Sequence, residues 1–190
     1  MSTQINSQIG IARPEGGDAT QCLSFQLGSE VFAVGILNVR EIIEYGQLTA
    51  VPMMPASVRG VINLRGAVVP VVDLRRRFGG ESTQVERRTC IVIVEVVREA
   101  EVQVVGVLVD AVNEVLDIPD SRIEPPPSFG TRLRTDFIRG MAKMDQGFIL
   151  ILNLDRVLAL EELEALSVGG GTEMPVVGES APRDADAVPA

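Results

Sequence analysis

The sequence predicts a mainly β protein made of two similar halves, and two observations carry this prediction. The stretch Arg59–Phe78 (RGVINLRGAVVPVVDLRRRF) holds two β-branched runs joined by Arg65-Gly66, a pattern typical of a β-hairpin because glycine accepts the positive φ of a tight turn. Residues 139–158 (RGMAKMDQGFILILNLDRVL) repeat the pattern eighty positions later. Both faces of the hairpin strands are apolar, so we expect a closed or double-layered β structure.

The repeat also extends upstream of the hairpin. Phe32–Ile43 (FAVGILNVREII) matches Val105–Leu116 (VGVLVDAVNEVL) at an offset of seventy-three, and Pro52 and Pro125 keep that offset. The sequence therefore predicts a tandem arrangement, with a first repeat at residues 20–80 and a second at 89–166.

The first repeat begins with a predicted hairpin. Residues 1–19 have no sustained period and are expected to form a disordered tail. Cys22–Leu27 alternates as a strand does, Gly28-Ser29 favours a turn, and Val31–Gly35 is the predicted partner strand.

Two further elements are expected before the central hairpin. Leu37–Ile43 has apolar residues at 39, 42 and 43, which favours a short helical turn laid against a barrel. Leu48–Val51 is a predicted strand, and Pro52–Pro55 a loop.

The second repeat follows a polar connector. Thr89–Val97 and Val102–Val109 are predicted strands around a charged turn. A C-terminal helix is expected from Leu154 to Leu166, with Asn153 or Asp155 as its cap. Residues 167–190 are rich in Gly, Pro and Ala and acidic, so a disordered tail is expected there.

Composition excludes several classes of function. The formal net charge of −9 argues against a nucleic-acid partner, which needs a positive face. The chain has no histidine and a single lysine, and it lacks a phosphate-binding glycine loop, so we expect no enzyme activity, no cofactor and no metal. No apolar stretch reaches the roughly 18–20 residues of a membrane span, and no signal peptide is evident.

The two cysteines lie at matching points of the two repeats. Cys22 and Cys90 each stand near the start of the first strand of their repeat. Strand-located thiols in such a chain are expected to be small core residues rather than a disulfide or a metal site.

The string Val58–Gly79 (VRGVINLRGAVVPVVDLRRRFG), preceded by FAVGILNVREII, resembles the CheW family of bacterial chemotaxis proteins. The resemblance covers roughly residues 20–166. It implies two intertwined five-stranded SH3-like β-barrels around a shared hydrophobic seam, with short helices and a C-terminal helix.

The resemblance also implies a function. Members of this family are adaptors that couple chemoreceptors to the histidine kinase CheA. The implied partners are the regulatory domain of a CheA-type kinase and the cytoplasmic tip of chemoreceptors, with possible self-association in arrays. The implied location is the cytoplasm, at membrane receptor arrays and without direct membrane insertion. A scaffold of a CheA-type pathway other than chemotaxis is the alternative.

Five positions are implied to contact protein partners. The receptor-contacting groove of the family corresponds to Val39, Glu41 and Arg65, with Val115 in the second repeat, and Gly60 stands where the first contact surface needs a small residue. Each has a structural alternative: the valines as core, Glu41 as a surface acid and Arg65 as a solvated turn residue.

Other charged residues have structural interpretations. Asp73 and Asp110 each end an apolar run, which favours a backbone-capping role. Arg75-Arg76-Arg77 is expected to form a solvated face or to pair with Glu44 or Asp73.

Overall fold

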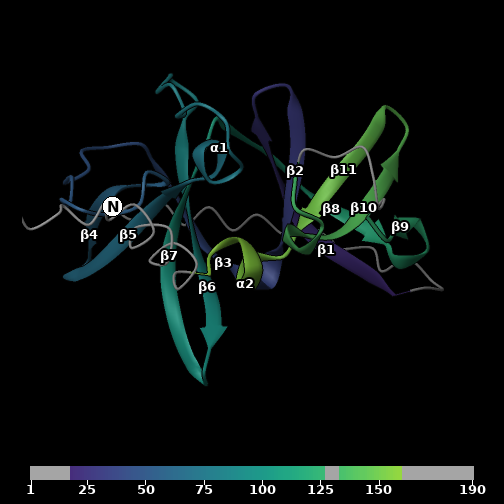
Figure 1. Cartoon of the computed structure of the whole chain (residues 1–190). Helices are drawn as coiled ribbons and strands as arrows, with labels where there is room; N and C mark the ends of the chain where they lie inside the picture. The colour runs from purple at the N-terminus through teal and green to yellow at the C-terminus, as the bar shows by residue number, and fades with distance from the viewer. Residues whose placement is uncertain (1–17, 127–132, 160–190) are drawn as a thin grey trace, which may run out of the picture.

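The structure is a computed structural model that describes residues 18–126 and 133–159. The predicted tails, and the part of the expected C-terminal helix that follows Ala159, lie outside these residues. The prediction of a mainly β chain is confirmed, because the described residues form eleven strands in two sheets that lie side by side (Figure 1).

The two sheets differ by one short strand. The six-stranded sheet has the order β8 (Ala111–Pro119), β1 (Ala19–Leu27), β2 (Glu30–Gly35), β11 (Gly147–Leu152), β10 (Ile138–Met144), β9 (Ile123–Glu124). The five-stranded sheet has the order β3 (Val39–Glu44), β6 (Cys90–Arg98), β7 (Glu101–Val109), β5 (Ala67–Asp73), β4 (Val58–Leu64). We call the five-stranded sheet the first barrel and the six-stranded sheet the second barrel.

In the part of the chain that the structure describes, five short helical segments connect or end the strands. They are η1 (Ile36–Asn38), α1 (Leu74–Arg77), η2 (Asp120–Arg122), η3 (Thr135–Phe137) and α2 (Leu154–Val157). Figure 1 shows α2 between the two barrels.

The two halves of the chain exchange their first hairpins. The β1–β2 hairpin of the first repeat joins the second barrel, where β2 pairs in parallel with β11. The β6–β7 hairpin of the second repeat joins the first barrel, where β7 pairs in parallel with β5. Each barrel therefore contains strands of both repeats, which is the intertwining that the resemblance implied.

The glycine of the repeated Arg-Gly pair stands in the same structural setting in both halves of the chain. Gly60 and Gly140 each follow a bulge, in β4 and β10 respectively. A crossing segment approaches each glycine: the Thr49–Val61 bridge in the first barrel and β9 in the second. A Cβ on Gly60 would lie 2.6 Å from the carbonyl oxygen of Thr49, and one on Gly140 would lie 2.6 Å from Cγ2 of Ile123. A side chain at either position would crowd the crossing segment, and at Gly60 it would meet the backbone itself.

Three groups of buried apolar side chains hold the structure together. One fills the first barrel around Val71 and Ile93, and another fills the second barrel around Ala33 and Ile151. The third and largest lies between the barrels, and Phe25 of β1 packs in it. Consecutive residues of β6 are buried, so both of its faces pack against core, which explains its almost continuous apolar sequence.

Both cysteines are free thiols, and each packs against apolar core residues. Cys22 is fully buried and Cys90 is partly buried. Burial raises the pKa of both thiols above the ordinary value because it disfavours the thiolate. The expectation of core cysteines is confirmed.

Two predicted elements are wrong. Leu37–Ile43 is not a helical turn, because only Ile36–Asn38 is helical and β3 begins at Val39. Leu48–Val51 is not a strand, because only Thr49 of this segment makes a β-bridge. A turn follows at Pro52-Met53.

Candidate protein-binding surface

Glu41 and Arg65 form a bidentate ion pair on the first barrel. Nη1 and Nη2 of Arg65 donate to Oε1 and Oε2 of Glu41 at 2.8 and 2.9 Å. The side chain of Arg65 is 75% exposed and that of Glu41 26%. This hydrogen bonding to Glu41 raises the pKa of Arg65 above its ordinary value. The pair joins β3 to the turn between β4 and β5 and fixes the plane of the guanidinium group.

Arg65 occupies a backbone conformation that arginine seldom adopts. Its φ is 51° and that of Gly66 is 86°, as in a two-residue hairpin turn with two positive φ values. The turn is further held by Asn63, whose Oδ1 accepts from the N–H of Gly66 at 2.9 Å. Asparagine or glycine would suit the position of Arg65 better, so its side chain is not explained by the turn.

Exposed apolar side chains lie on the strands that carry this pair. Val68, two residues after the hairpin turn on β5, is 72% exposed, and Ile42 of β3 is 45% exposed but points to the opposite face of the sheet from Glu41. An exposed arginine held in one plane is a residue type that is enriched in protein-binding surfaces.

The other three predicted residues lie in different environments. Val39 is half-buried against the central core, on the same strand as Glu41. Gly60 is buried in β4, where it makes room for Thr49. Val115 is 50% exposed but lies on β8 of the second barrel, opposite Leu23 of β1. The structure thus brings Glu41 and Arg65 together and places Val115 on the other barrel.

Asp73 forms a buried network that the sequence only partly predicted. As expected, it caps α1, because Oδ1 accepts from the N–H groups of Arg75 and Arg76. The connector adds Thr83, whose N–H donates to Oδ2 at 2.7 Å and whose hydroxyl donates to Oδ1 at 2.8 Å. Arg59 completes the network, with its Nη1 at 3.3 Å from Oδ2 of Asp73. This network ties β4, β5 and the connector together.

Among the described residues, the arginine side chains of α1 contact partners other than Glu44 and Asp73, whose pairing was one of the two expected alternatives. Arg75 lies 3.7 Å from Asp110, which also accepts from the N–H of Gly28 at 2.6 Å. Arg76 donates to the carbonyl of Gly80. Arg77 instead joins the two halves of the chain: its Nε donates to the carbonyl of Val157 at 2.8 Å.

Across residues 18–126 and 133–159, no group of three or more Cys, Asp and Glu side chains is placed to hold a metal ion. In the same part of the chain, no helix is long and apolar enough to cross a membrane.

The described chain thus forms two barrels with exchanged hairpins, and the first of them carries an exposed ion pair held by two hydrogen bonds. The chain belongs to the CheW family: a family model of the CheW-like domain matches residues 21–162.

Known proteins agree with this assignment. A probable chemotaxis protein CheW of Rhizobium etli is 38% identical over 145 residues, which cover 76% of this chain and 91% of that protein. A chemotaxis protein CheW of Klebsiella aerogenes is 32% identical over 141 residues, covering 74% and 82%. The crystal structure of the scaffolding protein TtCheW from Thermoanaerobacter tengcongensis superposes with a TM-score of 0.67 at 34% identity, covering 77% of this chain and 92% of that one. CheW proteins are scaffolds or adaptors rather than enzymes.

Proposed function

We propose that this chain is a cytoplasmic adaptor that couples chemoreceptors to a CheA-type histidine kinase. Its membership of the CheW family is the observation that carries the proposal. The adaptor performs no chemistry of its own. It binds the regulatory domain of the kinase through one surface and the cytoplasmic tip of a receptor through another, at membrane receptor arrays.

The Glu41–Arg65 pair is the centre of the proposed receptor surface. Exposed ion pairs add little to stability, and Arg65 stands in a conformation that a different residue would adopt more easily. Neither fold stability nor turn geometry therefore accounts for this arginine. A guanidinium held in one plane before binding loses less conformational entropy when it contacts a partner.

The remaining proposed contacts support this surface in different ways. Val39 lies two residues before Glu41 and anchors β3 to the central core. Gly60 acts through the position of β4, since it is buried. Val115 offers an exposed aliphatic contact on the second barrel. Both surfaces are expected to be modest in area and partly polar, as in exchangeable signalling complexes.

Arg65→Ala is expected to lower the affinity for a receptor-tip fragment by about tenfold or more, as for an arginine at the centre of an interface. Arg65→Asn should do the same while leaving the fold intact, because asparagine tolerates a positive φ. The affinity for the kinase regulatory domain should stay unchanged in both variants. Titration calorimetry with each partner measures the two affinities.

The matched control is Arg122→Ala, which removes the same charge from η2 of the second barrel. It should leave the receptor affinity within about twofold of the unsubstituted chain. An equal loss in Arg65→Asn and Arg122→Ala would show that net charge, and not the Glu41–Arg65 surface, sets receptor binding.

Glu41→Gln tests whether Glu41 acts by positioning Arg65. Because glutamine replaces one of the two acceptor oxygens with an NH2 donor that would face the guanidinium, the side-by-side pair of hydrogen bonds is lost, and the receptor affinity should fall, by less than in Arg65→Ala. In the double variant Glu41→Gln/Arg65→Ala, the loss should equal that of Arg65→Ala alone. Additive losses in the double variant would mean that Glu41 contacts the receptor independently of Arg65.

A further inference from the structure

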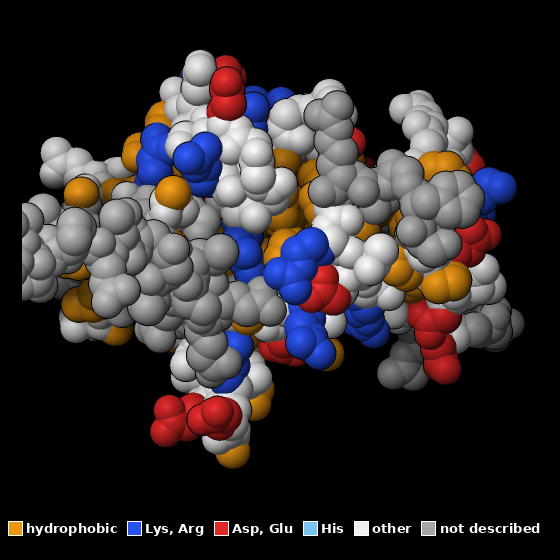
Figure 2. Space-filling model, viewed as in Figure 1, with side chains coloured by type: hydrophobic (Ala, Val, Ile, Leu, Met, Phe, Trp, Pro, Cys, Tyr) orange, Lys and Arg blue, Asp and Glu red, His pale blue; other side chains and the backbone are white. Residues whose placement is uncertain are grey.

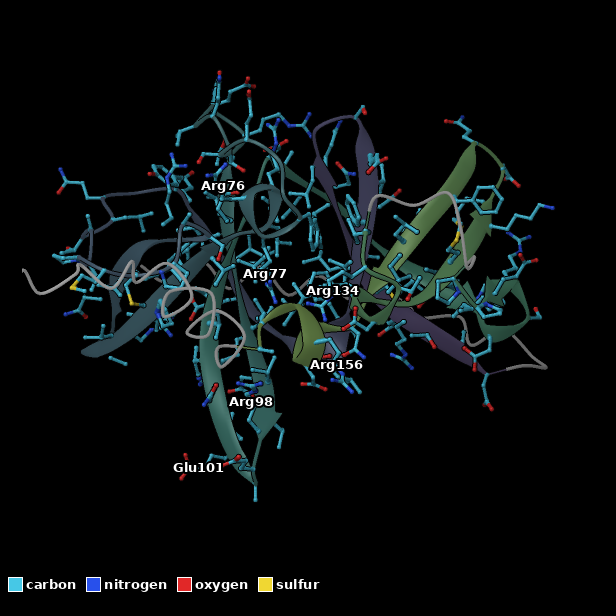
Figure 3. The ribbon with its side chains drawn as sticks, viewed as in Figure 1. Arg76, Arg77, Arg98, Glu101, Arg134 and Arg156 are labelled. Atoms are coloured by element: carbon cyan, nitrogen blue, oxygen red, sulfur yellow. The ribbon has the colours of Figure 1, made fainter. Side chains whose placement is uncertain are left out.

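The β6–β7 hairpin is longer than the β1–β2 hairpin that matches it in the first repeat. The strands of the longer hairpin form nine cross-strand pairs, and those of the shorter one form six. In the described chain, β3 pairs with β6 no further than Val94, and β5 pairs with β7 only from Gly106 onward. Residues 95–105 therefore form a two-stranded ribbon, whose end extends below both barrels in Figure 1. Figure 3 labels Arg98 and Glu101 near this end.

One face of the ribbon continues the apolar core of the first barrel into solvent. Ile93 of β6 and Val104 of β7 pack in that core. Side chains along a strand alternate between its faces, so Val97 lies on the same face as Ile93. Val97 stands opposite Val102, and the two side chains are 65% and 60% exposed. In Figure 2, the projecting end carries hydrophobic side chains beside acidic ones. The ribbon thus presents an exposed pair of valines.

The same face of the sheet carries the Glu41–Arg65 pair. Glu41 stands opposite Ile93 in the β3–β6 ladder, and residues paired across a ladder point to one face. Ile43, two residues after Glu41, packs in the same core, which fixes this face independently. Val97 is four residues beyond Ile93, which is about 13 Å along β6. The ion pair and the valine pair therefore lie on one side of the sheet, at a distance that one partner segment can span.

A second ion pair lies between these two features. Nε of Arg40 lies 3.2 Å from Oε1 of Glu95, and the two side chains are 51% and 38% exposed. Glu95 belongs to the same face because it stands two residues before Val97 and opposite Val104. This face therefore combines paired charges with exposed aliphatic groups, a mixture typical of protein-binding surfaces. Valines at the end of a projecting ribbon add little to the core, whereas a partner that covers them gains the free energy of their burial.

We propose that Val97 and Val102 form a second contact for the receptor segment that docks at Arg65, and that this segment is an amphipathic α-helix lying along β6. The contact rests on the proposed function, because it belongs to the same receptor surface. Helix residues seven, eight or eleven positions apart share one face and span about 10–17 Å, which matches the distance along β6. One side chain of such a helix accepts from the remaining N–H groups of Arg65, and an aliphatic side chain two or three turns away packs on the valines.

Two variants of the ribbon test this contact by titration calorimetry with the receptor-tip fragment. Val97→Thr/Val102→Thr keeps the β-branched shape but makes the pair polar, so the receptor affinity should fall by about fivefold or more. Deleting residues 97–98 and 101–102 removes two cross-strand pairs without changing the net charge. It keeps the two-residue turn and the faces of the other residues, and the affinity should fall at least as far. The affinity for the kinase regulatory domain should stay unchanged in both variants.

The matched control is Val51→Thr/Val85→Thr, which changes two exposed valines outside the strands and should leave the receptor affinity within about twofold. If Arg65→Ala weakens receptor binding but both ribbon variants bind like the unsubstituted chain, the ribbon contact is wrong and the proposed function stands. If the unsubstituted chain binds no receptor fragment, both are wrong. Equal losses in the control and in the ribbon variants would also overturn the contact. Ribbon variants that lose self-association on size-exclusion chromatography, with the receptor affinity unchanged, would assign the valines to a second copy of the chain instead.

Discussion

Asp73→Ala is expected to destabilise the protein by about 3–5 kcal/mol, the range for removing one partner of a buried, charged network. Asp73 is 1% exposed and accepts from two backbone N–H groups of α1, from Arg59 and twice from Thr83. Its removal leaves the N–H and hydroxyl of Thr83 buried without acceptors, which is the costly part. For a chain of this size, the melting temperature should fall by roughly 6–20 °C.

Asp73→Asn distinguishes the network from a simple helix cap. An asparagine keeps one oxygen for α1, but its amide N–H₂ would face the N–H of Thr83 and the guanidinium of Arg59, which are also donors. The loss should therefore come within about 1 kcal/mol of that for alanine. Thermal unfolding followed by circular dichroism measures both variants. Asp120→Ala is the control, because this acid is exposed and its carboxylate accepts an exposed hydrogen bond from Thr20 at 2.8 Å; its removal should change stability by less than about 0.5 kcal/mol. An Asp73→Asn variant as stable as the unsubstituted chain would contradict the role of the network.

Gly60→Ala is the second large expected effect, with a loss of about 2–4 kcal/mol. The new Cβ would lie 2.6 Å from the carbonyl oxygen of Thr49, and this backbone atom belongs to the bridge that closes the first barrel. The φ of +154° adds strain for any residue with a side chain. Urea unfolding gives the loss directly.

Two other glycines calibrate this prediction. Gly46→Ala adds a Cβ with nothing within 4 Å, so it should be nearly neutral. Gly140→Ala would meet mainly a methyl group of Ile123, which a side-chain rotation can move, so its loss should lie between the two. If Gly60→Ala were as mild as Gly46→Ala, the close approach of Thr49 would not be what requires glycine at position 60.

The hairpins and the repeat could be predicted from the sequence because both are local patterns. Alternation and turn residues mark β1–β2, β4–β5 and β6–β7 without reference to the rest of the chain. The exchange of the first hairpins between barrels could not be obtained this way. It depends on the parallel pairs β2–β11 and β5–β7, which join residues far apart in sequence and leave no local signal.

The error at Leu37–Ile43 has a physical cause. A bulge between Val39 and Glu41 interrupts the alternation of β3, so the apolar residues at 39, 42 and 43 take on the spacing of a helix. Leu48–Val51 has the composition of a strand, but only Thr49 meets β4 before the turn at Pro52. Strand propensity cannot show how much of a neighbouring edge is available.

The candidate surface was predictable as separate residues but not as a pair. Glu41 and Arg65 were each indicated by the resemblance, whereas their contact joins β3 to a turn 24 residues away. The role of Thr83 had no signal, because it lies in a connector of ordinary polar composition. Contacts of this kind arise from the closure of the barrel and not from any local pattern.

An adaptor of the proposed kind must bind a receptor and a kinase at the same time. The most direct measurement mixes the purified chain with the regulatory domain of a CheA kinase and a receptor-tip fragment, both from the same cell, and follows the complexes by size-exclusion chromatography with light scattering. We expect one complex that contains all three components, and no complex of the kinase domain with the receptor fragment when the chain is left out. If the chain binds no CheA-type regulatory domain of that cell, the fold stands and the proposed coupling function is wrong.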